Sequence, residues 1–323
     1  MKSHSDKPQT LEKTQRLSLP VFHGRSRAFW MILVALAAIA LYLPSLGFDF
    51  AYDSVMQVHY DDFIHTPRHF ADVLSLRVLG MDVLDFNRPV NLFTLMVDSL
   101  LWGKNPAGFR LTNLILHGAA AALLLRWLLL FTGGRLWPAL LATLVFAAHP
   151  IHTEAVVEVS NREDLLATVF LLLGLNAAAA FRPGDAGRTW GPALLTVVSL
   201  FLAAASKESG AAGPVVLAGF WLLLRRGRGE SPWAWGTLVG AATAGVALFF
   251  TLRFALEPKP SLVFAHPPPP SPRRGSTGCL SKRGFGVRSF CASCGPRICA
   301  PITARIICSI SPPSGLFWAF FPS

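Results

Sequence analysis

Histidine, acidic and basic side chains crowd into one short stretch of the chain, between two runs of apolar residues. The stretch contains His149, His152, Glu154 and Glu158, and ends at Arg162 and its acidic neighbours. An ionised side chain at the centre of a bilayer costs about 2.5 to 3.5 kcal/mol even on lenient insertion scales, so water, a charged partner or a ligand must neutralise such a cluster. The stretch therefore indicates a functional site at the edge of a membrane.

Three roles are open for His149 and His152 of this stretch. They could form structural hydrogen bonds at a helix end, contact a phosphate, or bind a metal ion, and Glu154 or Glu158 could orient an imidazole. Their spacing differs from that of the helical His-Glu-x-x-His zinc site, which argues against metal binding. We therefore assign no metal ligand.

The composition is that of an integral membrane protein. Hydrophobic residues make up 52% of the chain and charged residues 15%. A hydrocarbon core about 30 Å thick requires about 20 apolar residues in a helix. We predict an all-α fold with about seven spans, of which the third and sixth are short, near residues 29–46, 108–131, 136–149, 162–181, 190–206, 211–224 and 234–252.

A further apolar segment, residues 89–102, is predicted to lie along the membrane surface instead of crossing it. Asn91, Thr94 and Asp98 recur there at helical spacing and form a polar stripe. A helix of this length reaches only about 21 Å at 1.5 Å per residue. It belongs to a long outer loop, residues 47–107, and long loops in compact domains are usually functional.

The basic residues favour one orientation. Residues 1–28 form a basic tail that the positive-inside tendency holds in the cytoplasm, and the first span follows as an uncleaved anchor. If residues 89–102 lie flat, the cytoplasmic loops receive Arg135, Arg182, Arg188, Arg225, Arg226 and Arg228. The long loop, the histidine-rich stretch and Lys207 then share the outer face. Ser160 and Glu163 fit a capping box at the start of the fourth span.

Several short motifs follow one another along residues 29–257. They are Tyr52-Asp53-Ser54, Asn87-Arg88-Pro89, Gly103-Lys104-Asn105-Pro106 with Asn113 and His117, His149-Pro150-Ile151-His152-Thr153-Glu154, Arg162-Glu163-Asp164 and Ser206-Lys207-Glu208. In this order they resemble the motifs of the transmembrane and tetratricopeptide-repeat O-mannosyltransferases and their bacterial relatives, which are polytopic glycosyltransferases of the GT-C class. The most specific motif is the His-Pro-x-His-Thr-Glu block. No 34-residue helical repeat is present in the sequence.

The resemblance implies a GT-C-like multi-span bundle that transfers a mannose-like hexose, with inversion, from a polyprenyl-phosphate donor to a hydroxyl of a protein or glycan acceptor. It implies a multi-pass protein, which we expect in a bacterial inner membrane with the active site facing the periplasm. The partners would be this donor, the acceptor and membrane lipids, without nucleic acid; a divalent metal stays open. The alternatives are a non-enzymatic transporter or flippase for a lipid-linked saccharide, and an inactive truncated product.

The resemblance assigns the role of general base to Asp53. A positioned carboxylate that accepts the hydroxyl proton is worth about 10² to 10⁴ in rate. The family pattern has a second acid next to it, whereas this chain has Ser54, so Asp61 and Asp62 are candidates for part of the role. The competing interpretation is that Asp53 caps a turn or is simply solvated in a polar loop.

Cations near the membrane plane would stabilise the charge that gathers on the leaving phosphate. Arg88 could instead mark the helix start at Pro89, and Lys207 and Glu208 could simply pair with each other. Glu208 is otherwise an orienting residue, like the two glutamates above. The candidates for the donor phosphate are Arg88, His149, His152, Arg162 and Lys207.

Residues 258–323 differ in character from the rest of the chain. They contain no Asp or Glu, a proline run at 267–270 and all five cysteines. The Cys spacing matches no standard zinc finger or ribbon, and the basic residues follow no nucleic-acid-binding pattern. We predict a shifted reading frame, because G- and C-rich codons for residues 291–299 can encode, in another frame, a Trp-Pro sequence similar to a later block of the same family.

Overall fold

The computed structural model describes residues 25–224 and 231–257, and within them the regular secondary structure is helical, without a strand. The predicted all-α, multi-span membrane fold is confirmed. Residues 1–24 of the basic tail and the segment 258–323 lie outside the described residues. Helices long and apolar enough to cross a membrane occur, within the described ranges, at Arg27–Gly47, Pro106–Phe131, Val159–Ala180, Thr189–Ser206 and Pro232–Leu256.

Two of the predicted spans, the third and the sixth, form short helices. They are α5 (Leu136–Ala148) and α9 (Gly213–Leu224), with 13 and 12 residues. At 1.5 Å per residue each reaches about 20 Å, against a hydrocarbon core of about 30 Å. Five of the seven predicted spans thus correspond to helices long and apolar enough to cross a membrane in the described part of the chain, and the other two to shorter apolar helices.

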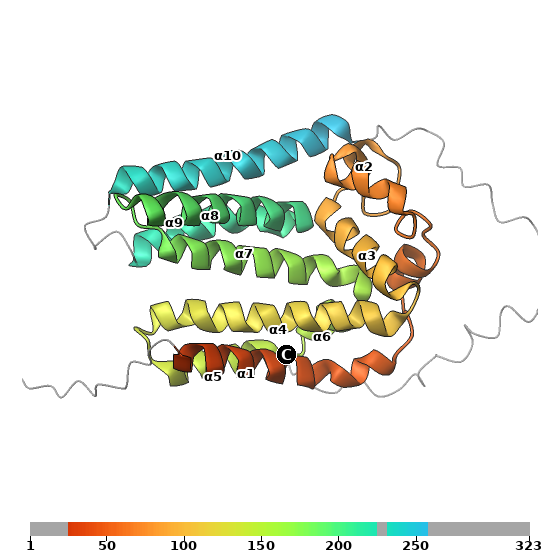
Figure 1. Ribbon diagram of the computed structural model, residues 1–323, viewed down its shortest axis with the longest axis horizontal. Coiled ribbons are helices and arrows are strands. Elements are labelled where there is room, and N and C mark those ends of the chain that lie inside the picture. The colour runs from red at the N-terminus through yellow and green to blue at the C-terminus, as the bar shows by residue number, and fades with distance from the viewer. Residues whose placement is uncertain (1–24, 225–230, 258–323) are drawn as a thin grey trace, which may run out of the picture. The chain divides into compact units, whose positions relative to one another are not determined.

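The long helices pack side by side. α4 (Pro106–Phe131), α7 (Arg162–Ala180), α8 (Ala186–Ser206) and α10 (Pro232–Leu256) follow one another across the bundle, as Figure 1 shows. α1 (Arg25–Tyr42) and α5 pack against α4. Buried aliphatic and aromatic side chains of α7 to α10 form one core, and those of α1, α4 and α5 another.

Helix α3 (Pro89–Trp102) crosses one end of the bundle obliquely instead of running parallel to α4 and α7 (Figure 1). Gly103 ends α3 with φ +62°, and Asn105 caps α4 by accepting the N–H of Ala107 at 3.0 Å, so the chain turns sharply between the two helices. The predicted polar stripe of α3 is not turned to water: Asn91 and Asp98 are buried against protein.

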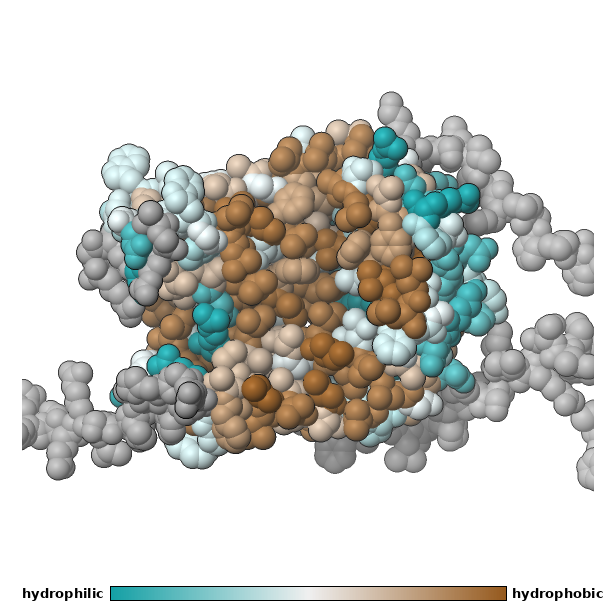
Figure 2. Space-filling view, in the orientation of Figure 1, coloured by the Kyte–Doolittle hydropathy of each residue, from teal (hydrophilic) through white to brown (hydrophobic). Residues whose placement is uncertain are grey.

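Short helical segments complete the described chain at this end. They are η1 (Leu43–Gly47), η2 (Val55–His59), η3 (Pro67–His69), α2 (Phe70–Leu74), η4 (Arg77–Gly80), α6 (His152–Val157), η5 (Val159–Asn161) and η6 (Glu208–Ala212). Figure 2 shows a hydrophobic band across the middle of the molecule and a dense hydrophilic surface at this end. At the opposite end, Trp137, Trp190 and Trp233 are exposed near the starts of α5, α8 and α10, as in the aromatic belts of membrane proteins.

Candidate functional site

Three adjoining hollows lie at the end of the bundle that carries α3 and α6. Their volumes are about 730, 380 and 220 Å³, and Asn161 lines all three. Asp53 lines the largest and the smallest. The other charged or titratable residues in their walls include Asp49, Asp85, Arg88, Arg110, His152, Glu154, Glu158, Glu163, Asp164 and Lys207. Most of the predicted site residues are thus brought together from the outer loop, α6, α7 and the α8–α9 connection.

The turn at Asp53 is strained and firmly held. Tyr52 has φ +46°, a conformation that costs a non-glycine residue about 1 to 3 kcal/mol, and its side chain is 89% exposed. Ser54, by contrast, is 1% exposed. Its backbone N–H donates to Glu158 Oε1 at 3.1 Å, its hydroxyl contacts the same oxygen, and Ser160 N–H donates to Ser54 Oγ at 3.0 Å. These bonds fix the backbone while the carboxylate of Asp53 stays exposed.

The contacts of Ser54 give a physical reason for the missing second acid. A carboxylate at position 54 would point at the carboxylate of Glu158, and two like charges in contact disfavour each other's ionised form. Glu158 therefore holds the Asp53 turn instead of orienting an imidazole as predicted. Asp53 is left as the acid of this turn that faces the hollows.

The smallest hollow is lined by a cluster of paired charges around Arg88. Its guanidinium contacts Asp85 at 3.3 Å, Glu163 at 3.3 Å and Glu208 at 3.5 Å. Burial alone would lower the pKa of Arg88, but the three carboxylates outweigh burial and raise it. Arg88 is thus a fixed cation surrounded by acids.

Asp85 is the residue of this cluster that sequence reasoning missed. It adopts φ +54° and accepts hydrogen bonds from Gln57 and, at 3.3 Å, from Asn91. Burial raises the pKa of its carboxyl, although Arg88 and the two amides oppose the shift. The signal in the sequence that could have identified Asp85 is its position just before the Asn-Arg-Pro motif. Its backbone conformation could not be predicted from the sequence.

Lys207 and Glu208 do not pair with each other, so that alternative is wrong. Lys207 Nζ lies 2.5 Å from Asp164 Oδ2 and 3.7 Å from Glu163 Oε1, on the wall of the 380 Å³ hollow. Glu208 accepts from Arg253 of α10 at 3.0 Å. The ion pair between Arg253 and Glu208 thus connects α10 to the α8–α9 connection.

Arg162 lies outside the three hollows and is fully buried. Its guanidinium contacts Asp98 of α3 at 2.6 Å and donates to Asn113 of α4 at 2.7 Å and to the Phe109 carbonyl at 2.9 Å. These contacts join α7 to α3 and α4. We therefore leave Arg162 out of the donor site.

The predicted capping box of α7 is wrong. Asn161 occupies the N-cap position of α7 without a side-chain capping bond, and the hydroxyl of Ser160 donates to Glu158 at 3.2 Å. The span nevertheless begins where predicted. Asn161 donates its side-chain amide to Glu154 at 3.2 Å, so Glu154 contacts an amide and not an imidazole.

The two histidines differ in their surroundings. His152 lines the 380 Å³ hollow, and its ring lies 4.4 Å from that of Phe146 and 5.5 Å from that of His117. Burial, with a smaller contribution from His149, lowers the pKa of His152, which favours a neutral ring at pH 7. His149 is exposed, and its Nδ1 accepts the N–H of Ile151 at 3.2 Å. His152 is therefore the histidine that lies in the site.

Asp61 and Asp62 are not brought together with Asp53, because neither lines these hollows. Asp61 accepts the N–H of Phe63 at 2.9 Å, a local turn contact, and burial raises the pKa of its carboxyl. In the described part of the chain, no group of three His, Cys, Asp or Glu residues is placed to hold a metal ion.

About half of the chain is a distant match to protein O-mannosyl-transferases. It is 28% identical over 183 residues to protein O-mannosyl-transferase TMTC3 of Mus musculus, and this match covers 55% of this chain and 20% of the relative. It is 32% identical over 160 residues to TMTC2 of Mus musculus, and this match covers 47% of the chain and 19% of that relative. With TMTC4 of Mus musculus it shares 36% identity over 141 residues, 38% of the chain and 19% of the relative.

The chain thus spans about a fifth of the length of these relatives. No protein-family model matches it, and no solved structure matches it. The predicted resemblance to this family of transferases is confirmed as a partial, distant match.

Proposed function

We propose that this chain is, or forms part of, a membrane glycosyltransferase that moves a mannose-like hexose from a polyprenyl-phosphate donor to a hydroxyl of a protein or glycan acceptor. The names of its relatives support transfer of mannose. The observation that carries the assignment to this end of the bundle is the exposed Asp53 carboxylate, which lies on a strained, anchored turn where two hollows adjoin. Strained backbone is concentrated at functional sites.

In the proposed reaction, the acceptor oxygen attacks the anomeric carbon of the sugar as the bond from that carbon to the phosphate oxygen breaks. Attack from the side opposite the leaving group inverts the configuration at that carbon. Asp53 accepts the hydroxyl proton, and the polyprenyl phosphate leaves with its electron pair. A positioned carboxylate contributes about 10² to 10⁴ in rate to such a step.

The leaving phosphate is proposed to lie in the 380 Å³ hollow, near Lys207 and His152. Lys207 has three N–H donors, and its two carboxylate contacts leave one for a ligand. A neutral His152 ring can still donate one hydrogen bond. Arg88 is already contacted by three carboxylates, so it would have to release one of them to bind phosphate directly.

We propose that this end of the bundle faces the periplasm of a bacterial inner membrane. The support is the positive-inside tendency, because Arg135 and Arg182 follow the ends of α4 and α7 at the opposite end of the bundle. The polyprenyl chain of the donor would then lie in the outer leaflet of that membrane.

The test is transfer of labelled hexose from a polyprenyl-phosphate donor to acceptor by the purified chain, with donor binding measured separately. We expect Asp53→Asn to remove transfer and to retain donor binding, and Asp62→Asn, an exposed acid of the same loop, to change neither. Donor movement across vesicles without transfer, unaffected by Asp53→Asn, would establish a transporter instead. Absence of both activities in the wild-type chain would contradict the proposal.

A further inference from the structure

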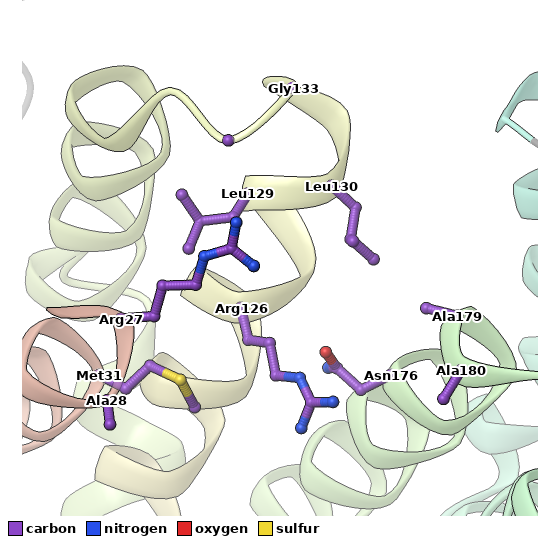
Figure 3. Close-up of a pocket in the computed structure, with 11 residues that line it drawn as sticks. Arg27, Ala28, Met31, Arg126, Leu129, Leu130, Gly133, Asn176, Ala179 and Ala180 are labelled. Carbon is purple, nitrogen blue, oxygen red and sulfur yellow. The ribbon is translucent and has the colours of Figure 1, made fainter. Parts of the chain in front are cut away.

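A separate hollow of about 530 Å³ lies at the opposite end of the bundle, between α1, α4 and α7. Arg27 of α1 and Arg126 of α4 line it, as does Asn176 of α7. Figure 3 shows the Arg27 guanidinium near Leu129 and the Arg126 guanidinium beside the Asn176 amide. The proposed function uses none of these residues.

The walls of this hollow combine two cations with apolar surface. Met31, Leu129 and Ala180 supply hydrophobic contacts, and the arginines supply planar groups that suit phosphate oxygens. A phospholipid has the same two parts, an anionic headgroup and acyl chains. Basic pockets between membrane helices bind lipid headgroups in this way.

Asn176 adds a second, independent indication of a ligand. Its side chain is 3% exposed, and its Nδ2 donates to the carbonyls of Leu123 at 3.1 Å and Leu172 at 2.8 Å. The amide nitrogen donates to two carbonyls, whereas the amide oxygen has no hydrogen-bond partner within the described residues. Figure 3 shows this oxygen turned toward the hollow. A buried acceptor without a partner costs about 1 to 3 kcal/mol, so a ligand that donates a hydrogen bond would stabilise it.

We propose that this hollow binds the headgroup of an anionic phospholipid that carries a hydroxyl, as phosphatidylglycerol does, in the leaflet at the end of the bundle where α1 begins. The phosphate contacts Arg27 and Arg126, and the headgroup hydroxyl donates to Asn176 Oδ1. The acyl chains leave along the apolar walls. This site depends on insertion of the bundle in a membrane and not on the proposed transfer reaction.

A simpler role for Arg126 is to stay hydrated at the boundary between membrane and water, where the positive-inside tendency favours arginine. That role requires no ligand. It predicts no preference among lipids of equal charge and no part for Asn176. The two accounts therefore differ in what lipid-binding experiments would show.

The test is retention of added lipid by the whole detergent-purified chain, measured by native mass spectrometry with phosphatidylglycerol, phosphatidylmethanol and phosphatidylcholine. We expect phosphatidylglycerol to be retained over phosphatidylcholine, and Arg126→Gln to lower its retention about fivefold, as expected for loss of one arginine near a lipid surface. The matched control is Arg135→Gln, which removes an exposed arginine at the same end but outside the hollow. It should leave retention unchanged.

Asn176→Leu should lower retention of phosphatidylglycerol and leave that of phosphatidylmethanol, a phosphodiester of equal charge without a headgroup hydroxyl, unchanged. Equal losses from Arg126→Gln and Arg135→Gln would show general surface attraction and overturn the proposal. Displacement of phosphatidylglycerol by glycerol phosphate at an equal concentration would overturn the lipid assignment, because it would identify a site for a soluble phosphate. A fold defect in either variant would appear as a lower thermal midpoint without added lipid.

Discussion

Two clusters of charge lie at the same end of the bundle and are built in opposite ways. In the buried cluster, Arg162, Asp98 and Asn113 are almost entirely shielded from solvent, and Arg162 bonds to both of the others. In the open cluster, Asp53 and Arg88 line hollows. Both clusters come from motifs with the same residue types. Charged residues near a membrane edge can therefore either join helices to one another or form a functional site. The two cases differ in how exposed the side chains are and in how many hydrogen bonds they can still form.

The largest effect is expected from Arg162→Gln in the buried cluster. Asp98 would be left as a buried carboxylate without its cation, and breaking such a pair costs about 3 to 5 kcal/mol. Thermal unfolding in detergent should show a strongly lowered midpoint, with Arg135→Gln as the exposed control. A loss below about 1 kcal/mol, as for a surface ion pair, would remove the distinction between the clusters.

A smaller effect is expected at Ser54, the neighbour of Asp53. Ser54→Asp would place a second carboxylate against Glu158 and remove a hydroxyl that accepts the Ser160 N–H, at a cost of about 1 to 3 kcal/mol. Adding Glu158→Gln should recover part of the loss, because the repulsion disappears. If the double variant is no more stable than Ser54→Asp alone, the like-charge explanation for the missing second acid is wrong.

The smallest effect is expected from the titration of Asp85 in the open cluster. Burial raises the pKa of its carboxyl above 3.8, so the folded chain binds this proton more readily than the unfolded chain. The free energy of unfolding should therefore fall as pH rises from about 3.8 through the raised pKa. Thermal midpoints measured from pH 4 to 7 should show a fall in the wild type, relative to Asp85→Asn. Parallel curves for the two proteins would contradict the assignment.

Much of the fold was predictable because hydrophobic length is a strong signal. The long helices α4, α7, α8 and α10 were all placed from apolar runs, and the oblique α3 from its short length. The number of full spans was not predictable in the same way. Apolar runs 136–149 and 211–224 are hydrophobic enough for a membrane but short, and the sequence alone did not give the positions at which their helices end.

The site was predictable in its residue types but not in their partners. The motifs around Asp53, His152 and Lys207 contribute to adjoining hollows, whereas Asp61 was proposed only because it is an acid nearby. The roles of Arg162 and Glu158 depend on contacts across 49 or more positions of sequence, to Asn113 and Ser54. Periodicity and spacing within one segment carry no information about such pairs.

The most direct test of the account is to measure sugar transfer and thermal midpoint together for Asp53→Asn and Asp98→Asn, two changes of the same chemical kind in the two clusters. The account predicts that Asp53→Asn lowers transfer by about 10² to 10⁴ and leaves the midpoint unchanged. Asp98→Asn should lower the midpoint and reduce transfer only in proportion to the folded fraction. Full transfer by a folded Asp53→Asn variant, or a lowered midpoint for it equal to that of Asp98→Asn, would contradict the central claim.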